Sequence, residues 1–286
     1  ITFVERGVVI VGESMFSWVD VVEIRIAGRG LRGQSDPTHP YLRDTREDAS
    51  KSGVMANIRH VSFNGSTTDG GSRLFVSTTG PGAPNQIVAV DVPSRRWKRL
   101  ASMPLNQIWH CLQWHGGLLY VAGGYARLEL NTLYSFNEAT GWEQLPPMPQ
   151  SCRAAASGVI GNQLFITGGL QSSALQIYDI ATKTWRFGAP HPSFPWPTNG
   201  REHGVVVDEK LFLFGSRVRG PLTEPENYRT LVYDPQSDTW TEEAPPWYAG
   251  HRVMHACAHD GTVVVFLENG TAFARAMDGA WSPCAL

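Results

Sequence analysis

Four arginines and one tryptophan open successive apolar strands at the same point of a repeated pattern. They are Arg59, Trp109, Arg153, Arg201 and Arg252. Guanidinium groups suit bidentate capture of a carboxylate or phosphate, and Trp and Arg dominate the energetic centres of protein interfaces. Brought together, these residues predict binding of an acidic peptide segment, with Trp109 as an aromatic anchor. The alternative is that each arginine pairs with an acid or carbonyl of the neighbouring repeat, and both roles are compatible.

Two loops carry further candidates for partner binding. Tyr125 and Arg127 follow a glycine pair, while Arg217 and Arg219 lie in an enlarged segment, 216–229. Extended loops on a rigid scaffold commonly carry recognition, so we interpret these four residues as binding candidates. The alternative is a solvated loop without a partner.

The densest group of possible metal ligands consists of His251, His255, Cys257 and His259. On a strand, residues 255, 257 and 259 share one face, which makes metal ligation geometrically conceivable. A reduced thiol beside partly buried histidines is the commoner outcome for such a group. We therefore expect neither a metal nor another cofactor.

Sequence signatures of enzymes are absent from the chain: there is no GxSxG elbow, Walker loop, HExxH or nucleotide-binding glycine motif. The triplet Arg201–Glu202–His203 is the closest approach to a set of catalytic side chains. The sequence thus favours a protein that is not an enzyme.

The elements that must position these residues recur with a period of 41 to 55 residues, marked by tryptophans. These are Trp97, Trp142, Trp185, Trp240 and Trp281. Before each tryptophan lies a short apolar run that predicts a strand: 74–76, 119–121, 164–166, 211–213 and 263–265. A further strand ending in a polar turn separates the run from the first four tryptophans: 87–91, 133–137, 175–179 and 231–234. With the strand that opens each unit, every unit supplies four short antiparallel strands.

Several residues of the repeat are expected to be structural. Glycines after the second strand, namely Gly123, Gly124, Gly168, Gly169 and Gly215, would let the backbone adopt positive φ and neighbouring sheets approach closely. The tryptophans and the third-strand tyrosines, Tyr134, Tyr178 and Tyr233, would pack between sheets.

The phrases LLYVAGGY…LYSFNEATGWEQLPPMP and QLFITGGL…LQIYDIATKTW resemble the kelch repeat, strongly over residues 55–286 and weakly over 1–54. The resemblance implies an all-β, kelch-type β-propeller in which each repeat forms one blade of four antiparallel strands. We expect a single domain over 1–286 with six blades. The first is degenerate, covers 1–54, lacks the tryptophan and carries a long polar loop at 27–53; the others cover 55–104, 105–149, 150–192, 193–247 and 248–286.

In kelch propellers, the register of the strand-opening arginines is similar to the position from which arginines point over the mouth of the central channel. The resemblance therefore implies an arginine-lined face that binds a peptide or partner protein. Many such domains are substrate receptors of ubiquitin ligases, with a BTB or F-box region elsewhere in the chain, and scaffolding of the cytoskeleton is compatible too. The alternative is a carbohydrate-active enzyme, similar to a sugar mutarotase, that uses the channel mouth.

Bulk composition narrows the choice of partner and compartment. A net charge of −2 gives no reason to expect nucleic acid or an anionic membrane. Four scattered cysteines without a CxxC pair favour reduced thiols in an intracellular, cytoplasmic protein. The chain begins at Ile1, so we expect a domain cut from a longer protein, with other domains in the same chain.

Overall fold

The computed structural model of the chain describes residues 2–4, 7–10, 25–26, 32–33, 62–68, 72–80, 83–91, 96–169, 172–192, 203–216, 228–243, 253–259, 261–267, 271–276 and 278–284. These residues form strands and turns, and none of them belongs to a helix that could cross a bilayer.

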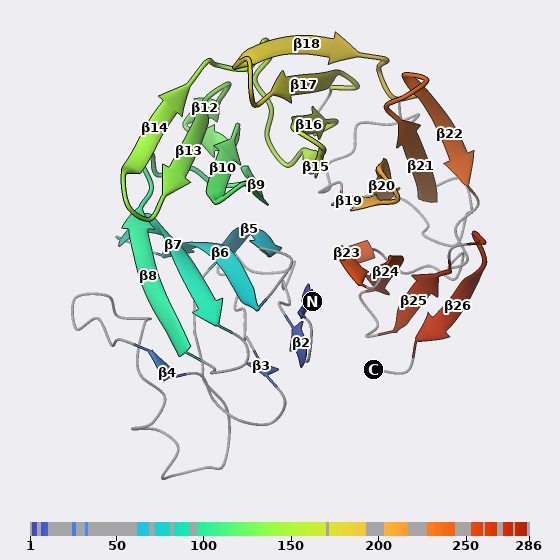
Figure 1. Ribbon diagram of the computed structural model, residues 1–286, viewed down its shortest axis with the longest axis horizontal. Helices are drawn as coiled ribbons and strands as arrows, with labels where there is room; N and C mark the ends of the chain where they lie inside the picture. The colour runs from blue at the N-terminus through green and yellow to red at the C-terminus, as the bar shows by residue number, and fades with distance from the viewer. Residues whose placement is uncertain are drawn as a thin grey trace. The chain divides into compact units, whose positions relative to one another are not determined.

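Five sheets each contain four neighbouring strands in chain order, and along the chain a separate two-stranded hairpin comes between the second and third strands of the second sheet (Figure 1). The first holds β5 (Ser62–Thr68), β6 (Arg73–Gly80), β7 (Ala83–Asp91) and β8 (Arg96–Ser102). The second holds β9 (Cys111–His115), β10 (Leu118–Ala122), β13 (Leu133–Asn137) and β14 (Gly141–Leu145). This order is that of a propeller blade, and each predicted apolar run lies on a second strand.

The remaining three blades repeat the pattern. The third contains β15 (Ala156–Ile160), β16 (Gln163–Thr167), β17 (Leu175–Asp179) and β18 (Thr184–Gly188). The fourth contains β19 (His203–Val207), β20 (Lys210–Ser216), β21 (Tyr228–Asp234) and β22 (Thr239–Glu243). The fifth contains β23 (Val253–His259), β24 (Thr262–Leu267), β25 (Ala272–Arg275) and β26 (Trp281–Cys284). Neighbouring strands within these sheets are antiparallel, as predicted.

The prediction of six blades is wrong, because the described residues contain five. The N-terminal segment forms a three-stranded sheet of β1 (Thr2–Val4), β2 (Gly7–Ile10) and β3 (Arg25–Ile26). Among the described residues, this sheet lacks a fourth strand that would complete a blade. From the expected polar loop, β4 (Arg32–Gly33) instead pairs in parallel with β8 and widens the first blade's sheet to five strands. Within the expected first blade, residues 11–24, 27–31 and 34–54 lie outside the described residues.

By the density of its contacts the chain divides into two compact units. Unit 1 comprises Ile1–Ile108, Leu112–Tyr120 and Ser135–Glu143; unit 2 comprises Trp109–Cys111, Val121–Tyr134 and Gln144–Leu286.

In unit 2, consecutive blades pack face to face through apolar side chains. Between the third and fourth blades, Phe165, Ile177, Leu211 and Tyr233 are fully buried in one cluster. Between the fourth and fifth blades, a second cluster is centred on Phe214 and Val265. Burial of both faces of each sheet is the chief stabilisation that a four-stranded blade cannot obtain alone.

Two glycines set how closely the first strands of the third and fourth blades approach. A Cβ on Gly204 of β19 would lie 2.7 Å from the carbonyl oxygen of Ser157 on β15. A Cβ on Gly158 would lie 2.5 Å from a methyl carbon of Val206. Since Cβ atoms do not approach other atoms so closely, only glycine permits this spacing.

The blade tryptophans lie on fourth strands, and three of them bond to the preceding blade. The indole Nε1 of Trp142 donates to Ser102 O at 2.8 Å, that of Trp185 to Pro146 O at 2.9 Å and that of Trp240 to Ala189 O at 2.8 Å. Each acceptor is the last residue of the previous fourth strand or the residue just after it. The repeat of the tryptophan is therefore also a repeat of one hydrogen bond between blades.

The polar residue that ends the third strand shapes the turn into the fourth. Asn137 Oδ1 accepts from the backbone N–H of Ala139 at 2.8 Å, and Asp179 Oδ1 accepts from that of Thr182 at 2.8 Å. This backbone hydrogen bond lowers the pKa of Asp179. Side chains of Asn and Asp that bond to the backbone ahead of them favour turns over continued strand.

Within unit 1, an ion triad joins β6 and β8 to the turn that precedes β14. Glu138 accepts from Arg73 Nη1 at 2.6 Å and from Lys98 Nζ at 2.5 Å. The Arg73 guanidinium also lies 5.1 Å from the ring centroids of both Phe75 and Trp114, which are stacked 4.7 Å apart. Arg73 thus holds these strands together through an ion pair and through cation–π contacts.

Candidate functional site

Two glycines flank the chain segment that carries Arg153. A Cβ on Gly123 would lie 2.7 Å from Cys152 O, and one on Gly169 would lie 2.6 Å from Arg153 O. Both glycines have positive φ, 62° and 91°. The glycine pairs of two consecutive repeats therefore leave just enough room for the backbone at Cys152–Arg153 to pass between them.

The strand-opening positions of two blades are joined by their backbones. Trp109 (φ 57°) and Ala154 (φ 55°) both adopt the left-handed conformation that is uncommon for residues other than glycine. The N–H of Ala154 donates to Trp109 O at 2.8 Å. Because such a backbone conformation costs free energy, its presence at Trp109 indicates that the surrounding structure fixes the position of this side chain.

Arg153 lies among two aromatic rings and one carboxylate. Its guanidinium carbon is 4.8 Å from the ring centroid of Tyr125 and 5.7 Å from that of Trp109. Its Nε is 3.1 Å from Glu129 Oε1, and the two rings are 6.1 Å apart. The side chain keeps 27% of its surface exposed, so the guanidinium is held and not enclosed. We call Trp109, Tyr125, Glu129 and Arg153 the arginine cluster.

A two-stranded hairpin supplies the tyrosine and the glutamate of this cluster. β11 (Tyr125–Ala126) pairs with β12 (Leu128–Glu129), and the register places Tyr125 opposite Glu129. The turn residue Arg127 has φ 71°. Because Tyr125 and Glu129 are directly opposed, both can contact Arg153 from the same hairpin.

Two buried thiols lie next to the cluster in the chain. Burial raises the pKa of Cys111 to about 11, and burial also raises the pKa of Cys152 well above its ordinary value. Cys111 Sγ lies 3.4 Å from Ala155 O, to which it donates. Because a thiolate is the reactive form, neither cysteine is a suitable nucleophile at neutral pH.

Of the nine residues predicted to bind a partner, the structure brings three together and places a fourth beside them. Trp109, Tyr125 and Arg153 are in contact, and Arg127 is at the exposed tip of the same hairpin. The other five lie outside the described residues: Arg59, Arg201, Arg217, Arg219 and Arg252.

Glu129 was not among the predicted residues. Its signal in the sequence is an acid four positions after Tyr125, which a tight hairpin places directly opposite. The ion pair between Arg153 and Glu129 is the structural role that the sequence offered as the alternative to partner binding. Arg153 remains partly exposed all the same.

One histidine of the fourth blade contacts one histidine of the fifth blade. His203 on β19 and His255 on β23 have ring centroids 6.0 Å apart, in an edge-to-face arrangement. Burial lowers the pKa of His255 well below its ordinary value. Within the described part of the chain, no three His, Cys, Asp or Glu side chains are grouped as metal ligands would be. His251, Arg201 and Glu202 fall outside that part.

The fold and the cluster define a class: a propeller of four-stranded blades in which an arginine and a tryptophan precede two first strands and contact a neighbouring hairpin. No family model matches the chain. Alpha-scruin of Limulus polyphemus is 27% identical over 193 residues, which cover 63% of this chain and 20% of that protein. A putative F-box/kelch-repeat protein of Arabidopsis thaliana is 24% identical over 157 residues, or 53% of this chain and 35% of that protein. Kelch-like protein 34 of Homo sapiens is 23% identical over 203 residues, covering 63% and 31%.

These relatives carry the repeat that the sequence shows, and the structure has the blades that the repeat specifies. The chain is therefore similar to kelch-repeat proteins, and its fold is a β-propeller of kelch-like repeats. The matched regions span between a fifth and about a third of the curated relatives' lengths.

Proposed function

We propose that this chain is a protein-interaction domain that binds a segment of a partner protein at the arginine cluster and the hairpin beside it. The observation that carries the proposal is the held but accessible guanidinium of Arg153, which lies over the neighbouring rings of Trp109 and Tyr125. Such groups lose little conformational freedom on binding because neighbours already fix them. Aromatic and arginine side chains are those that most often dominate binding energy at interfaces.

We further propose that the full-length protein acts as a substrate receptor of a ubiquitin ligase. Support comes from the F-box/kelch-repeat and Kelch-like proteins among the relatives. In this role the propeller binds the substrate, and the ligase machinery is recruited by another region.

The chemistry of the described site favours binding over catalysis. The cluster presents one guanidinium, one carboxylate already paired to it and two aromatic rings. The neighbouring thiols are protonated at neutral pH because burial raises the pKa of each. This set suits recognition of a carboxylate-bearing peptide and offers no pair of groups poised for proton transfer.

The test is proximity labelling in cells with the wild-type chain, Arg153→Ala, Arg201→Ala and the control Arg186→Ala. Arg186 is exposed on the fourth strand β18, away from strand openings. We expect a set of partners that Arg153→Ala and Arg201→Ala lose and Arg186→Ala retains, with thermal unfolding showing that all variants are folded. A partner list unchanged in both strand-opening variants contradicts the proposal.

For the ligase role, depletion of the full-length protein is expected to raise the abundance of the partners that depend on Arg153. Proteasome inhibition should produce the same rise without depletion. Partners whose abundance responds to neither treatment would contradict the receptor role while leaving the binding site intact.

A further inference from the structure

The hairpin beside the arginine cluster exposes a large apolar side chain next to a cation. Leu128 has 63% of its surface exposed, and the preceding Arg127 is exposed as well. Among the described residues, Phe187 is the one other large hydrophobic side chain with such exposure, at 52%. Phe187 lies on the fourth strand β18 of the third blade, so it provides an internal comparison.

The backbone at the base of the hairpin is fixed. Gly124 N donates to Cys152 O at 2.8 Å, and Leu130 N donates to Gly124 O at 2.9 Å. Cys152 N donates to Leu130 O at 3.1 Å. These bonds tie both ends of the hairpin to the segment that carries Arg153. The exposed tip is therefore held on a rigid base, as a binding loop requires.

Side chains reinforce this base. Arg153 contacts Tyr125 on one strand of the hairpin and Glu129 on the other. Its charge is thus partly neutralised within the chain, and its stacking on two rings limits its freedom. These contacts are those of a residue that positions the hairpin.

Arg127 differs from Arg153 in having no carboxylate within ion-pair distance in the described part of the chain. Its left-handed backbone, φ 71°, directs the chain through the turn and is a conformation in which non-glycine residues cost free energy. A cation without an ion-pair partner among the described residues, beside an exposed aliphatic side chain, complements a partner that offers an acid and an apolar group.

We propose that Arg127 and Leu128 are the specificity-determining contacts, and that they bind an extended peptide in which Asp or Glu lies within two residues of Leu, Ile or Val. Arg153 then acts as a positioning residue that holds the hairpin. This inference rests on the proposed protein-interaction function and names the part of that site that selects the partner.

The experiment is a phage-display selection of random 12-residue peptides on the immobilised 286-residue chain, followed by synthesis of enriched peptides and measurement of Kd by fluorescence polarisation. We expect enriched peptides to contain the acidic and aliphatic pair. Arg127→Ala and Leu128→Ser should each weaken their binding about tenfold or more. The control Phe187→Ser, which removes comparable exposed apolar surface, should leave Kd unchanged.

A charge exchange separates direct contact from structural damage. Arg127→Glu should abolish binding of the acidic peptide, and the same peptide with its acid replaced by Lys should regain affinity for that variant alone. Arg153→Ala should weaken binding of both peptides without such rescue. Unchanged thermal unfolding of the Leu128→Ser variant will show that the exposed side chain is not needed for folding.

The outcomes distinguish the two proposals. Peptides that bind well but are insensitive to Arg127→Ala and Leu128→Ser overturn the assignment of the hairpin and leave the interaction function standing. Failure to enrich any peptide overturns both. A dimer in sedimentation that Leu128→Ser dissociates would show that the tip binds a second copy, and would also overturn the peptide assignment.

Discussion

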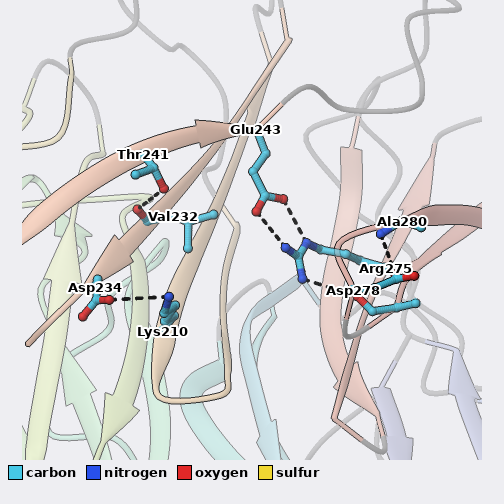
Figure 2. A network of polar contacts seen from close by, with 9 residues as sticks. Lys210, Val232, Asp234, Thr241, Glu243, Arg275, Asp278 and Ala280 are labelled. Atoms are coloured by element: carbon cyan, nitrogen blue, oxygen red, sulfur yellow. Dashed lines mark hydrogen bonds and ion pairs between the residues drawn. The ribbon is translucent and has the colours of Figure 1, made fainter.

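Glu243 on β22 accepts two hydrogen bonds from Arg275 on β25, from Nε at 2.9 Å and from Nη2 at 2.7 Å (Figure 2). The arginine side chain is only 16% exposed, and its guanidinium lies 5.0 Å from the ring centroid of Phe212. The pair therefore joins the fourth and fifth blades of unit 2 with the geometry for which a planar guanidinium is suited.

Replacement of Arg275 by lysine should destabilise the chain although it keeps the charge. We expect the free energy of unfolding to fall by about 1–2 kcal/mol, because lysine loses the second hydrogen bond and the stacking on Phe212. Urea unfolding measures the change. Lys210→Ala is the matched control, since Lys210 is exposed and pairs at 3.5 Å with the partly exposed Asp234 on the adjacent strand of the same blade. That variant should cost at most about 0.5 kcal/mol, and equal losses would contradict the argument.

Both backbone polar groups of Ala189, which follows the third blade's last strand, form hydrogen bonds with side chains of the fourth blade. Its N–H donates to Asp238 Oδ1 at 2.8 Å, and its carbonyl accepts from Trp240 Nε1 at 2.8 Å. The hydroxyl of the buried Tyr233 also donates to Asp238 Oδ1, at 2.6 Å.

Asp238→Ala should lower the free energy of unfolding by about 2 kcal/mol, because it leaves the Tyr233 hydroxyl without its acceptor. In a double-mutant cycle, Tyr233→Phe should recover part of that loss, since it removes the stranded donor. Asp238→Asn retains an acceptor oxygen and tolerance of the left-handed φ of 53°, and should cost clearly less. Strict additivity of the two single changes would refute the coupling.

The half-buried His255 predicts a dependence of stability on pH. Burial lowers its pKa well below 6.5, so the unfolded chain binds more protons as the pH falls below that value. The stabilisation is complete above about pH 6.5 and declines below it, with a limiting slope of about 1.4 kcal/mol per pH unit. His255→Phe should make the decline between pH 6.5 and 5 shallower in urea titrations. Parallel slopes for the variant and the wild type would exclude His255 as the source.

The pKa of Glu138 is also lowered, but here because the charged form is stabilised by neighbouring cations. The hydrogen bond from Lys98, together with Arg73, lowers the pKa of Glu138 below its ordinary value of 4.5. Its contribution is present above about pH 4.5 and is lost as the pH falls through the lower pKa of the folded state. Glu138→Gln should therefore cost no more than about 1 kcal/mol at pH 7, less in 1 M NaCl and nothing near pH 3. A cost that persists at pH 3 would point to packing instead of charge.

Much of the fold could be predicted because the repeat obeys local rules. Alternating apolar residues, a polar residue at the end of the third strand and the tryptophan that follows each have a direct structural cause. Asp179 illustrates this, since its side chain bonds to the turn that the sequence pattern predicted.

The parts of the fold and of the candidate site that were not predicted depend on contacts that the sequence repeat does not specify. Phe136 packs on Trp142 at a centroid distance of 5.0 Å and lies two positions beyond Tyr134. Phe136 has the place in its blade that Tyr178, which packs on Trp185, has in the next blade, and packing of Tyr134 between sheets stays a prediction. Glu129 was missed because a five-residue hairpin with a left-handed arginine at its turn has no strong sequence signature. The number of blades was overestimated because a few apolar residues near the N-terminus resembled blade strands.

The indole hydrogen bonds of Trp142, Trp185 and Trp240 all run in one direction, from each blade to the one before it. Loss of a blade at the N-terminal end of the row therefore exposes a different group from loss of a blade at the C-terminal end. Removal of a leading blade exposes a tryptophan N–H to water, while removal of a trailing blade exposes a carbonyl oxygen, so the two cut ends present a donor and an acceptor respectively.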